Sequence, residues 1–121
     1  MALPIPTKPT RTQSYNVHCT VLGTTYTLYT CPANCRAEVT MLMLNNVLGN
    51  ISLTVLWDDV STTNQVHIVG GKNMGAGEYI LFTGATLVLD AGDSLTINIP
   101  GTGSCQLDGL CTVTETFKPI G

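Results

Sequence analysis

Hydrophobic and polar positions alternate with a period of two along most of the chain after residue 13. The pattern is plain in ISLTVLWDD, where Ile51, Leu53, Val55 and Trp57 fall on one face. Alternation of this kind predicts β-strands that are buried on one side. Segments with this pattern, or with a short apolar run of strand length, cover residues 15–22, 26–30, 35–46, 51–59, 65–69, 78–82, 86–90, 94–100 and 110–117.

Turn signals separate these segments, and no stretch has a helical period. Pro32-Ala33-Asn34, Gly49-Asn50, DAGDS (90–94) and GTGS (101–104) carry the residues that favour tight turns. We therefore expect an all-β protein, an antiparallel β-sandwich of about eight strands over residues 14–121. The pattern leaves immunoglobulin-like and jelly-roll topologies open, although an antibody-type Cys…Trp…Cys arrangement is missing.

Three local predictions go with this pattern. The glycine-rich GGKNMGAG (70–77) is expected to be a loop that is mobile or makes contacts, because it lacks the order of a phosphate-binding loop. In the segment 35–46, one face is expected to hold Ala37, Val39, Met41 and Met43, and the other Leu42 and Leu44. The last segment has a less regular inner face, because Glu115 shares it with Cys111 and Val113.

Residues 1–13, MALPIPTKPTRTQ, differ from the rest in composition. Three prolines exclude helix and favour an extended chain. This segment is either a frayed terminus or an extended arm that docks on a neighbour, since a pre-extended chain loses little entropy on docking. In the arm interpretation the partner-binding residues are Leu3, Pro4, Ile5, Pro6, Lys8, Pro9 and Arg11.

Composition narrows the possible functions. Charged residues make up 11% of the chain, the net charge is −3, and the five Lys and Arg residues are scattered, so nucleic-acid binding is not expected. Low surface charge suits a subunit of an assembly. Apolar runs are too short to span a membrane, and the first ten residues lack the pattern of a signal peptide, so we expect a reducing cytoplasm.

The five cysteines are expected to pack as small hydrophobic residues. Cys31 and Cys35 lie four positions apart, which is not the spacing of common zinc sites, and the total is odd. A disulfide between these two, or a hairpin clip between Cys105 and Cys111, is the alternative. Cys31 and Cys35 can meet only if the strands on either side of the turn pair directly.

Catalytic and metal-binding residues are not expected. His18 and His67 both lie in strands, and nothing local activates a nucleophile beside them, although Cys19 or Cys31 could still meet His67 in space. The acidic clusters WDD (57–59) and LDAGDS (89–94) end strands, where aspartate serves turns more often than calcium binding or acid–base chemistry. We therefore predict a protein that is not an enzyme and has no cofactor.

Three stretches read together resemble a pattern common in small structural proteins of tailed bacteriophages. YTLYTCPANCRAEVTMLMLNN is similar to an aromatic strand, a Pro-Ala-Gly turn and a long apolar strand, and ISLTVLWDD and TLVLDAGDSLTI look like the strands that follow. The resemblance covers about residues 23–100. The chain departs from it at Asn34, where glycine is usual, and at Cys31 and Cys35, where a valine and a polar residue are ordinary.

The resemblance implies a β-sandwich, often a jelly roll, that serves as a head decoration (cement) protein. Its partners would be the major capsid protein and copies of itself in a homotrimer, with no nucleic acid or membrane. It would reside in the virion after synthesis in the cytoplasm of the bacterial host. A tail, neck or fibre-base component is the nearest alternative. A carbohydrate-binding module is a third, using Trp57, Tyr26, Tyr29 and Tyr79 with calcium at Asp58 or Asp93.

Overall fold

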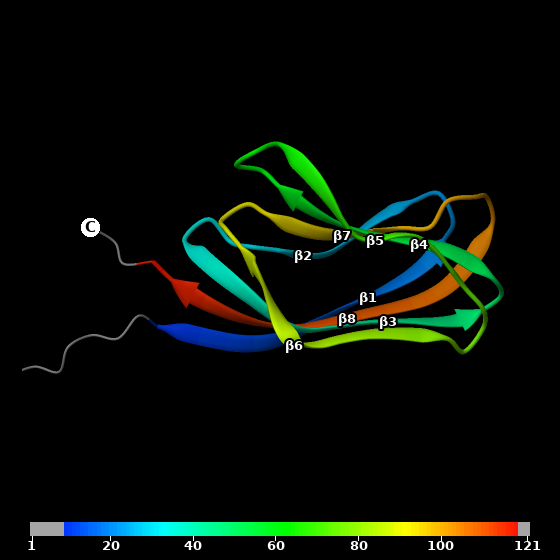
Figure 1. Ribbon diagram of the computed structural model, residues 1–121, viewed down its shortest axis with the longest axis horizontal. Helices are drawn as coiled ribbons and strands as arrows, with labels where there is room; N and C mark the ends of the chain where they lie inside the picture. Colours follow the sequence, from blue (N-terminus) through cyan, green and yellow to red (C-terminus); the bar gives the residue numbers. More distant parts are fainter. Residues whose placement is uncertain (1–8, 119–121) are drawn as a thin grey trace, which may run out of the picture.

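The computed structural model describes residues 9–118, apart from the side chains of residues 85 and 86. Eight strands make up the fold: β1 (Thr10–Val21), β2 (Thr25–Thr30), β3 (Cys35–Leu48), β4 (Ile51–Asp59), β5 (Asn64–Met74), β6 (Tyr79–Leu89), β7 (Ser94–Asn98) and β8 (Ser104–Phe117). They form two four-stranded antiparallel sheets packed face to face (Figure 1). The predicted all-β sandwich is therefore confirmed.

The strand order is that of a jelly roll. One sheet has the order β1-β8-β3-β6 and the other β2-β7-β4-β5. The first strand thus pairs with the last, the second with the seventh, the third with the sixth and the fourth with the fifth. This is one long hairpin wound so that successive pairs alternate between the two sheets. Of the two topologies that the sequence leaves open, the structure has the jelly roll.

Alternation along the strands fills the space between the sheets. Leu53 and Val55 of β4, Leu95 and Ile97 of β7, and Val113 of β8 have no exposed surface. Gly109, on the inner face of β8, keeps the sheets close at the centre. A Cβ atom added there would lie 2.9 Å from Cδ1 of Ile97 in the opposite sheet.

The predicted faces of β3 are wrong after Val39. The register with both neighbouring strands shifts between Val39 and Met41, which marks a β-bulge. An extra residue at this point reverses the direction of the side chains that follow, up to a second register shift between Asn46 and Leu48. Leu42 and Leu44 therefore join Ala37 and Val39 inside, and Met41 and Met43 turn outward. The bulge lets one strand continue a single apolar face despite a break in its sequence pattern.

Other predicted boundaries also change. The loop predicted for residues 70–77 is wrong for residues 70–74, which belong to β5, where a register shift at Gly70-Gly71 absorbs the glycines. Segments 78–82 and 86–90 belong to one strand, β6, whose register with β3 shifts between Thr83 and Leu87, next to Gly84 (φ 77°). The division predicted between residues 13 and 14 falls inside β1, because Thr10–Gln13 already pair with Val113–Thr116.

Candidate assembly surface

The two sides of the sandwich, where the edges of the sheets face each other, differ in chemistry. On the β1–β2 side, the backbone N–H groups of Thr20 and Val21 in β1 donate to the hydroxyl of Tyr26 in β2, at 3.1 and 3.0 Å. The Tyr29 hydroxyl of β2 donates to Glu115 of β8 at 2.7 Å. Side chains therefore tie the sheets together along this side.

Glu115 is the centre of that connection. Its carboxylate is 1% exposed and accepts from Nε (3.0 Å) and Nη2 (2.6 Å) of Arg11, as well as from Tyr29. Burial by itself raises the pKa of Glu115, but the hydrogen bonds from Tyr29 and Arg11 and the charge of Arg11 outweigh it, so that the pKa is lowered overall. Burial and the bond to Glu115 raise the pKa of Tyr29.

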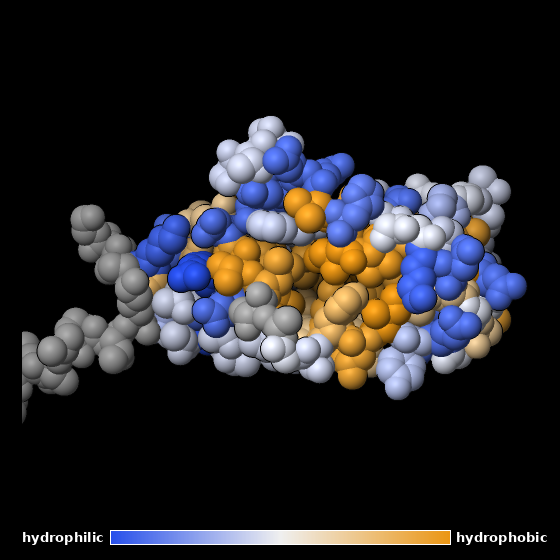
Figure 2. Space-filling model, in the orientation of Figure 1, coloured by the Kyte–Doolittle hydropathy of each residue, from blue (hydrophilic) through white to orange (hydrophobic). Residues whose placement is uncertain are grey.

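The β5–β6 side has exposed apolar side chains instead of polar contacts between the sheets. Ile80 and Phe82 of β6 lie opposite the buried Leu44 and Leu42, so they point toward the space between the sheets, yet Phe82 is 40% exposed. In the sheet that contains β4 and β5, Val66 of β5 lies opposite Trp57 of β4 on the inner face. Val66 is also partly exposed. Figure 2 shows apolar surface gathered and hollowed along this side, between β6 and the β4–β5 part of the other sheet.

The outer face of β6 is apolar as well. Tyr79 is 64% and Leu81 49% exposed, and Leu81 lies beside the outward Met43, which in turn lies beside Leu110. Exposed apolar surface on both faces of one strand marks a contact surface. We define the β6 surface as Tyr79, Ile80, Leu81, Phe82 and Thr83.

β6 is an edge strand whose backbone is open to pairing. Asn46 N–H donates to the carbonyl of Glu78 at 2.9 Å, so this carbonyl points toward β3. Backbone groups alternate between the two edges of a strand, which leaves those of Tyr79, Leu81 and Thr83 on the free edge.

Edge strands are commonly protected by charges, prolines or bulges. β1 has Arg11, and β5 has Lys72 and the register shift at Gly70-Gly71. β2 is short, has its own register shift and faces β1. Tyr79–Thr83 has no charge and no proline.

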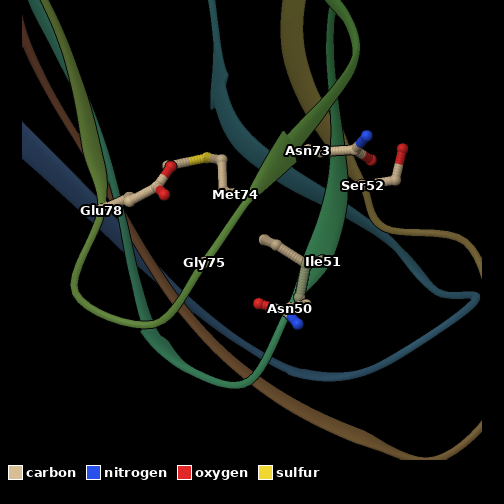
Figure 3. A pocket seen from close by; sticks show the side chains of 7 residues that line it. All are labelled: Asn50, Ile51, Ser52, Asn73, Met74, Gly75 and Glu78. Atoms are coloured by element: carbon tan, nitrogen blue, oxygen red, sulfur yellow. The ribbon is translucent and has the colours of Figure 1, made fainter.

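A hollow of about 540 Å³ with a mixed polar and apolar lining, which includes Ile51 and Met74, lies next to the start of β6 (Figure 3). Glu78 lines it from one strand connection, and Asn50, Ser52 and Asn73 line it from β4, β5 and their flanks. Close by, the buried Asn46 uses its amide N–H groups to hold the carbonyls of Gly49 (2.7 Å) and Met74 (3.2 Å). Among the described residues, Glu78 is the one ionisable group in the lining.

The predicted partner-binding residues divide into two groups. Leu3, Pro4, Ile5, Pro6 and Lys8 lie outside the described residues. Pro9 accepts a backbone hydrogen bond from Phe117 at 3.0 Å, and Arg11 is half exposed but bound to Glu115. The structure thus places Pro9 and Arg11 at the junction of β1 and β8. The arm as a binding element stays a prediction.

The cysteines are buried, as predicted. Cys19, Cys31, Cys35, Cys105 and Cys111 are all free thiols inside the protein. The turn after Cys31 crosses from one sheet to the other, so β2 and β3 do not pair, and Cys105 and Cys111 both lie in β8. Burial raises the thiol pKa to about 12 at Cys19 and to about 11 at Cys31 and Cys111. Such thiols stay protonated and poorly nucleophilic at neutral pH.

His18 and Asp93 make local polar contacts, whereas His67 is exposed on β5. His18 faces outward and pairs with Asp108 (2.5 Å), while the neighbouring Cys19 faces inward. Asp93 accepts from backbone N–H groups of Val60 (3.1 Å) and Asp90 (3.0 Å), as predicted for a turn aspartate. Within residues 9–118, side chains that the structure describes form no group of three potential metal ligands.

The aromatic side chains do not form a shared sugar-binding platform. Trp57 packs against the core and donates its indole N–H to Asp93 at 3.2 Å. Tyr29 is buried, and the Tyr26 hydroxyl is bound to β1. Tyr79 alone among the four is mostly exposed. Residues 9–118 also include no helix that is long and apolar enough to cross a membrane.

Sequence reasoning predicted a strand at 78–82 but missed the β6 surface. A signal was present: Tyr79, Ile80, Leu81 and Phe82 are four consecutive apolar residues without alternation. Such a run indicates a strand covered on both faces. Nothing within the described residues covers the outer face of β6. The apolar run therefore indicates that a partner covers this strand, which makes the β6 surface a candidate contact.

The sequence matches no protein-family model and no curated protein. Among solved structures, a subunit of Bacillus endospore appendages, described as a family of disulfide-linked pili, is 14% identical with a TM-score of 0.55, over 98% of this chain and 97% of that one. A chain of the cyanophage Pam1 capsid asymmetric unit is 13% identical (TM-score 0.43, 98% and 93% covered). A chain of infectious bursal disease virus, Gx strain, is 12% identical (TM-score 0.43, 88% and 33% covered). The appendage subunit shares the sandwich fold.

Proposed function

We propose that this chain is a non-enzymatic structural subunit of a virus particle, and that it serves as a decoration (cement) protein on the head of a tailed bacteriophage. Its partners are the major capsid protein and further copies of itself, most simply as a homotrimer. It acts in the virion after synthesis in the bacterial cytoplasm. Its mechanism is burial of surface at interfaces rather than chemistry at a site.

The observation that carries this proposal is the β6 surface. An edge strand with apolar side chains on both faces and free backbone groups promotes aggregation of an isolated protein. In a subunit of an assembly, the same strand can form a contact with a neighbour. The low charge of the whole chain supports the same interpretation, because large permanent interfaces are depleted of charged residues. The phage-like pattern at residues 23–100 directs the proposal to the phage head.

A filament subunit is the second candidate. It is favoured by the match to the endospore appendage subunit along nearly the whole of both chains. Those pili are described as disulfide-linked. Here all five cysteines are buried, so subunits would be held together by non-covalent contacts instead.

Immunogold labelling of intact virions that contain this chain tests the proposal. We expect gold particles spread over the head. Virions whose copy of the chain lacks residues 2–8 should carry at least about tenfold less of it, because these residues contribute to the contact. This deletion leaves β1 whole. Labelling confined to the tail, or no labelling, would contradict the decoration role.

A further inference from the structure

The free edge of β6 has the properties of a docking site for another strand. Pairing by an added strand satisfies the open backbone groups of Tyr79, Leu81 and Thr83 and covers apolar side chains on both faces. The occupant must therefore be extended, uncharged and apolar on both sides. It must also tolerate having no further strand on its other edge.

Residues 1–7 of the chain itself, MALPIPT, meet these requirements, and the charged Lys8 follows them. Residues 1–6 carry no charged side chain, and Leu3 and Ile5 alternate with Pro4 and Pro6. In an extended segment the N–H groups of Leu3, Ile5 and Thr7 point to one edge. The prolines leave the opposite edge without donors at the two intervening positions. The segment can pair on one side and end the sheet on the other.

We propose that residues 1–8 of one copy bind as an additional strand to the free edge of β6 in a second copy. Leu3 and Ile5 then lie on the outer face beside Tyr79 and Leu81, while the prolines lie beside Ile80 and Phe82. This inference deepens the proposed function, because it specifies how copies of the subunit contact each other. It requires a second copy of the chain and no other partner.

The chain cannot supply its own segment to this site. β1 and β6 are at opposite edges of the sheet, so a strand added beyond β6 lies four strand spacings from β1, about 19 Å. If Leu3–Thr7 pair with β6, only Lys8 and Pro9 join Thr7 to Thr10, and the three Cα-to-Cα steps span about 10 Å at most. The donor and the acceptor are therefore different copies.

Because donor and acceptor surfaces differ, copies can join head-to-tail, or two copies can exchange their segments about a two-fold axis. Head-to-tail contacts close into a ring when the rotation between copies fits a whole number of subunits, and otherwise continue as a filament. A trimeric ring agrees with the decoration role, and an open chain of copies agrees with the filament alternative.

The first test places a charge on the edge. Leu81→Lys puts an ammonium group in the proposed interface, whereas Val21→Lys makes the same change at an equally exposed valine (50%) in β1. By sedimentation velocity on the full-length proteins we expect L81K to weaken self-association at least about tenfold and V21K less than about twofold. Matching circular dichroism and thermal midpoints establish that both variants are folded. Equal effects of the two variants, or a wild-type protein that is monomeric at about 100 µM, overturn the inference.

The second test identifies the occupant. The native thiols are buried, so new surface cysteines will dominate disulfide formation. Mild oxidation of a mixture of Ile5→Cys and Leu81→Cys chains should give a disulfide-linked dimer on a non-reducing gel. A mixture of Ile5→Cys and Val21→Cys should give at least about tenfold less. Self-association without the Ile5–Leu81 crosslink would show that something other than the segment covers β6, and would overturn the inference.

The outcomes separate this inference from the proposed function. An oligomer that depends on Leu81 and crosslinks through Ile5, but whose chain is absent from virion heads, supports the inference and contradicts the decoration role. A chain that labels virion heads but is monomeric in solution supports the decoration role and overturns the inference.

Discussion

A single buried carboxylate connects both sheets with the start of the first strand. Glu115 lies on the inner face of β8, Tyr29 reaches it from β2, and Arg11 reaches it from β1. A buried charge is tolerated when it is paired and hydrogen-bonded, and it becomes costly when a partner is lost. Glu115 therefore contributes to the attachment of the start of β1 to the sandwich.

Replacing Glu115 by Gln should lower the free energy of unfolding by about 1–3 kcal/mol. The lower part of this range is favoured because Arg11 is half exposed, so that water can hydrate its charge. Urea unfolding at pH 7 measures the loss. Glu38→Gln is the matched control, since Glu38 is exposed on the outer face of β3, and it should change stability by less than about 0.5 kcal/mol.

The same carboxylate predicts a dependence on pH. The pKa of Glu115 in the folded protein lies below the ordinary value of 4.5. Its ionised form therefore stabilises the fold fully above that value, and the contribution is lost as the pH falls through the folded pKa. The difference in stability between wild type and E115Q should thus narrow below about pH 4. A difference that stays constant from pH 7 to pH 3 would contradict this assignment.

At the scale of the strands, Gly109 governs how closely β8 can approach the opposite sheet. A methyl group at this position would lie 2.9 Å from Cδ1 of Ile97 and 3.2 Å from Cγ1 of Val17, and Ile97 is fully buried. Overpacking of this kind forces core side chains out of their preferred rotamers. The glycine is required here for space.

Gly109→Ala should therefore destabilise the protein by about 1–3 kcal/mol in urea unfolding. Gly70→Ala in β5 is the matched control, because its nearest neighbour would be the His67 ring at 3.7 Å, an ordinary contact. The control should cost less than about 0.5 kcal/mol. If both variants are equally stable, the sheets are able to relax around the added methyl group.

The strands show what a sequence can and cannot predict. The alternation of apolar and polar residues was sufficient to predict β4 and β7. Each of these strands has a regular apolar face, and a turn residue stands just before it, Gly49 before β4 and Asp93 before β7. The alternation failed in β3 and β5, where bulges changed the side-chain direction or absorbed glycines. A bulge is stabilised by the register with neighbouring strands, and those neighbours are distant in the sequence. The β6 surface was missed for the same reason, because exposure of an edge depends on strand order.

For the whole molecule, the low charge and the apolar edge strand β6 predict how self-association depends on salt. If copies join through the β6 surface, the contact involves apolar burial and backbone hydrogen bonds, both of which are weakly screened by salt. The dissociation constant should change by less than about threefold between 0.1 and 1 M NaCl in sedimentation equilibrium. A strong weakening at high salt would indicate ion pairs, for instance through Lys8, as the main attraction.

The pairing of the first strand with the last has a consequence for synthesis. In the sheet, β1 has β8 as its one neighbour, so the N-terminal strand finds its place only after Ser104–Phe117 have been made. Contacts between such distant segments form slowly, because a long loop must close first. A nascent chain on the ribosome therefore carries residues 1–13 before it has a completed sandwich. If copies join through such a strand, they become able to exchange it only after β8 has been made, which delays assembly until that stage of synthesis.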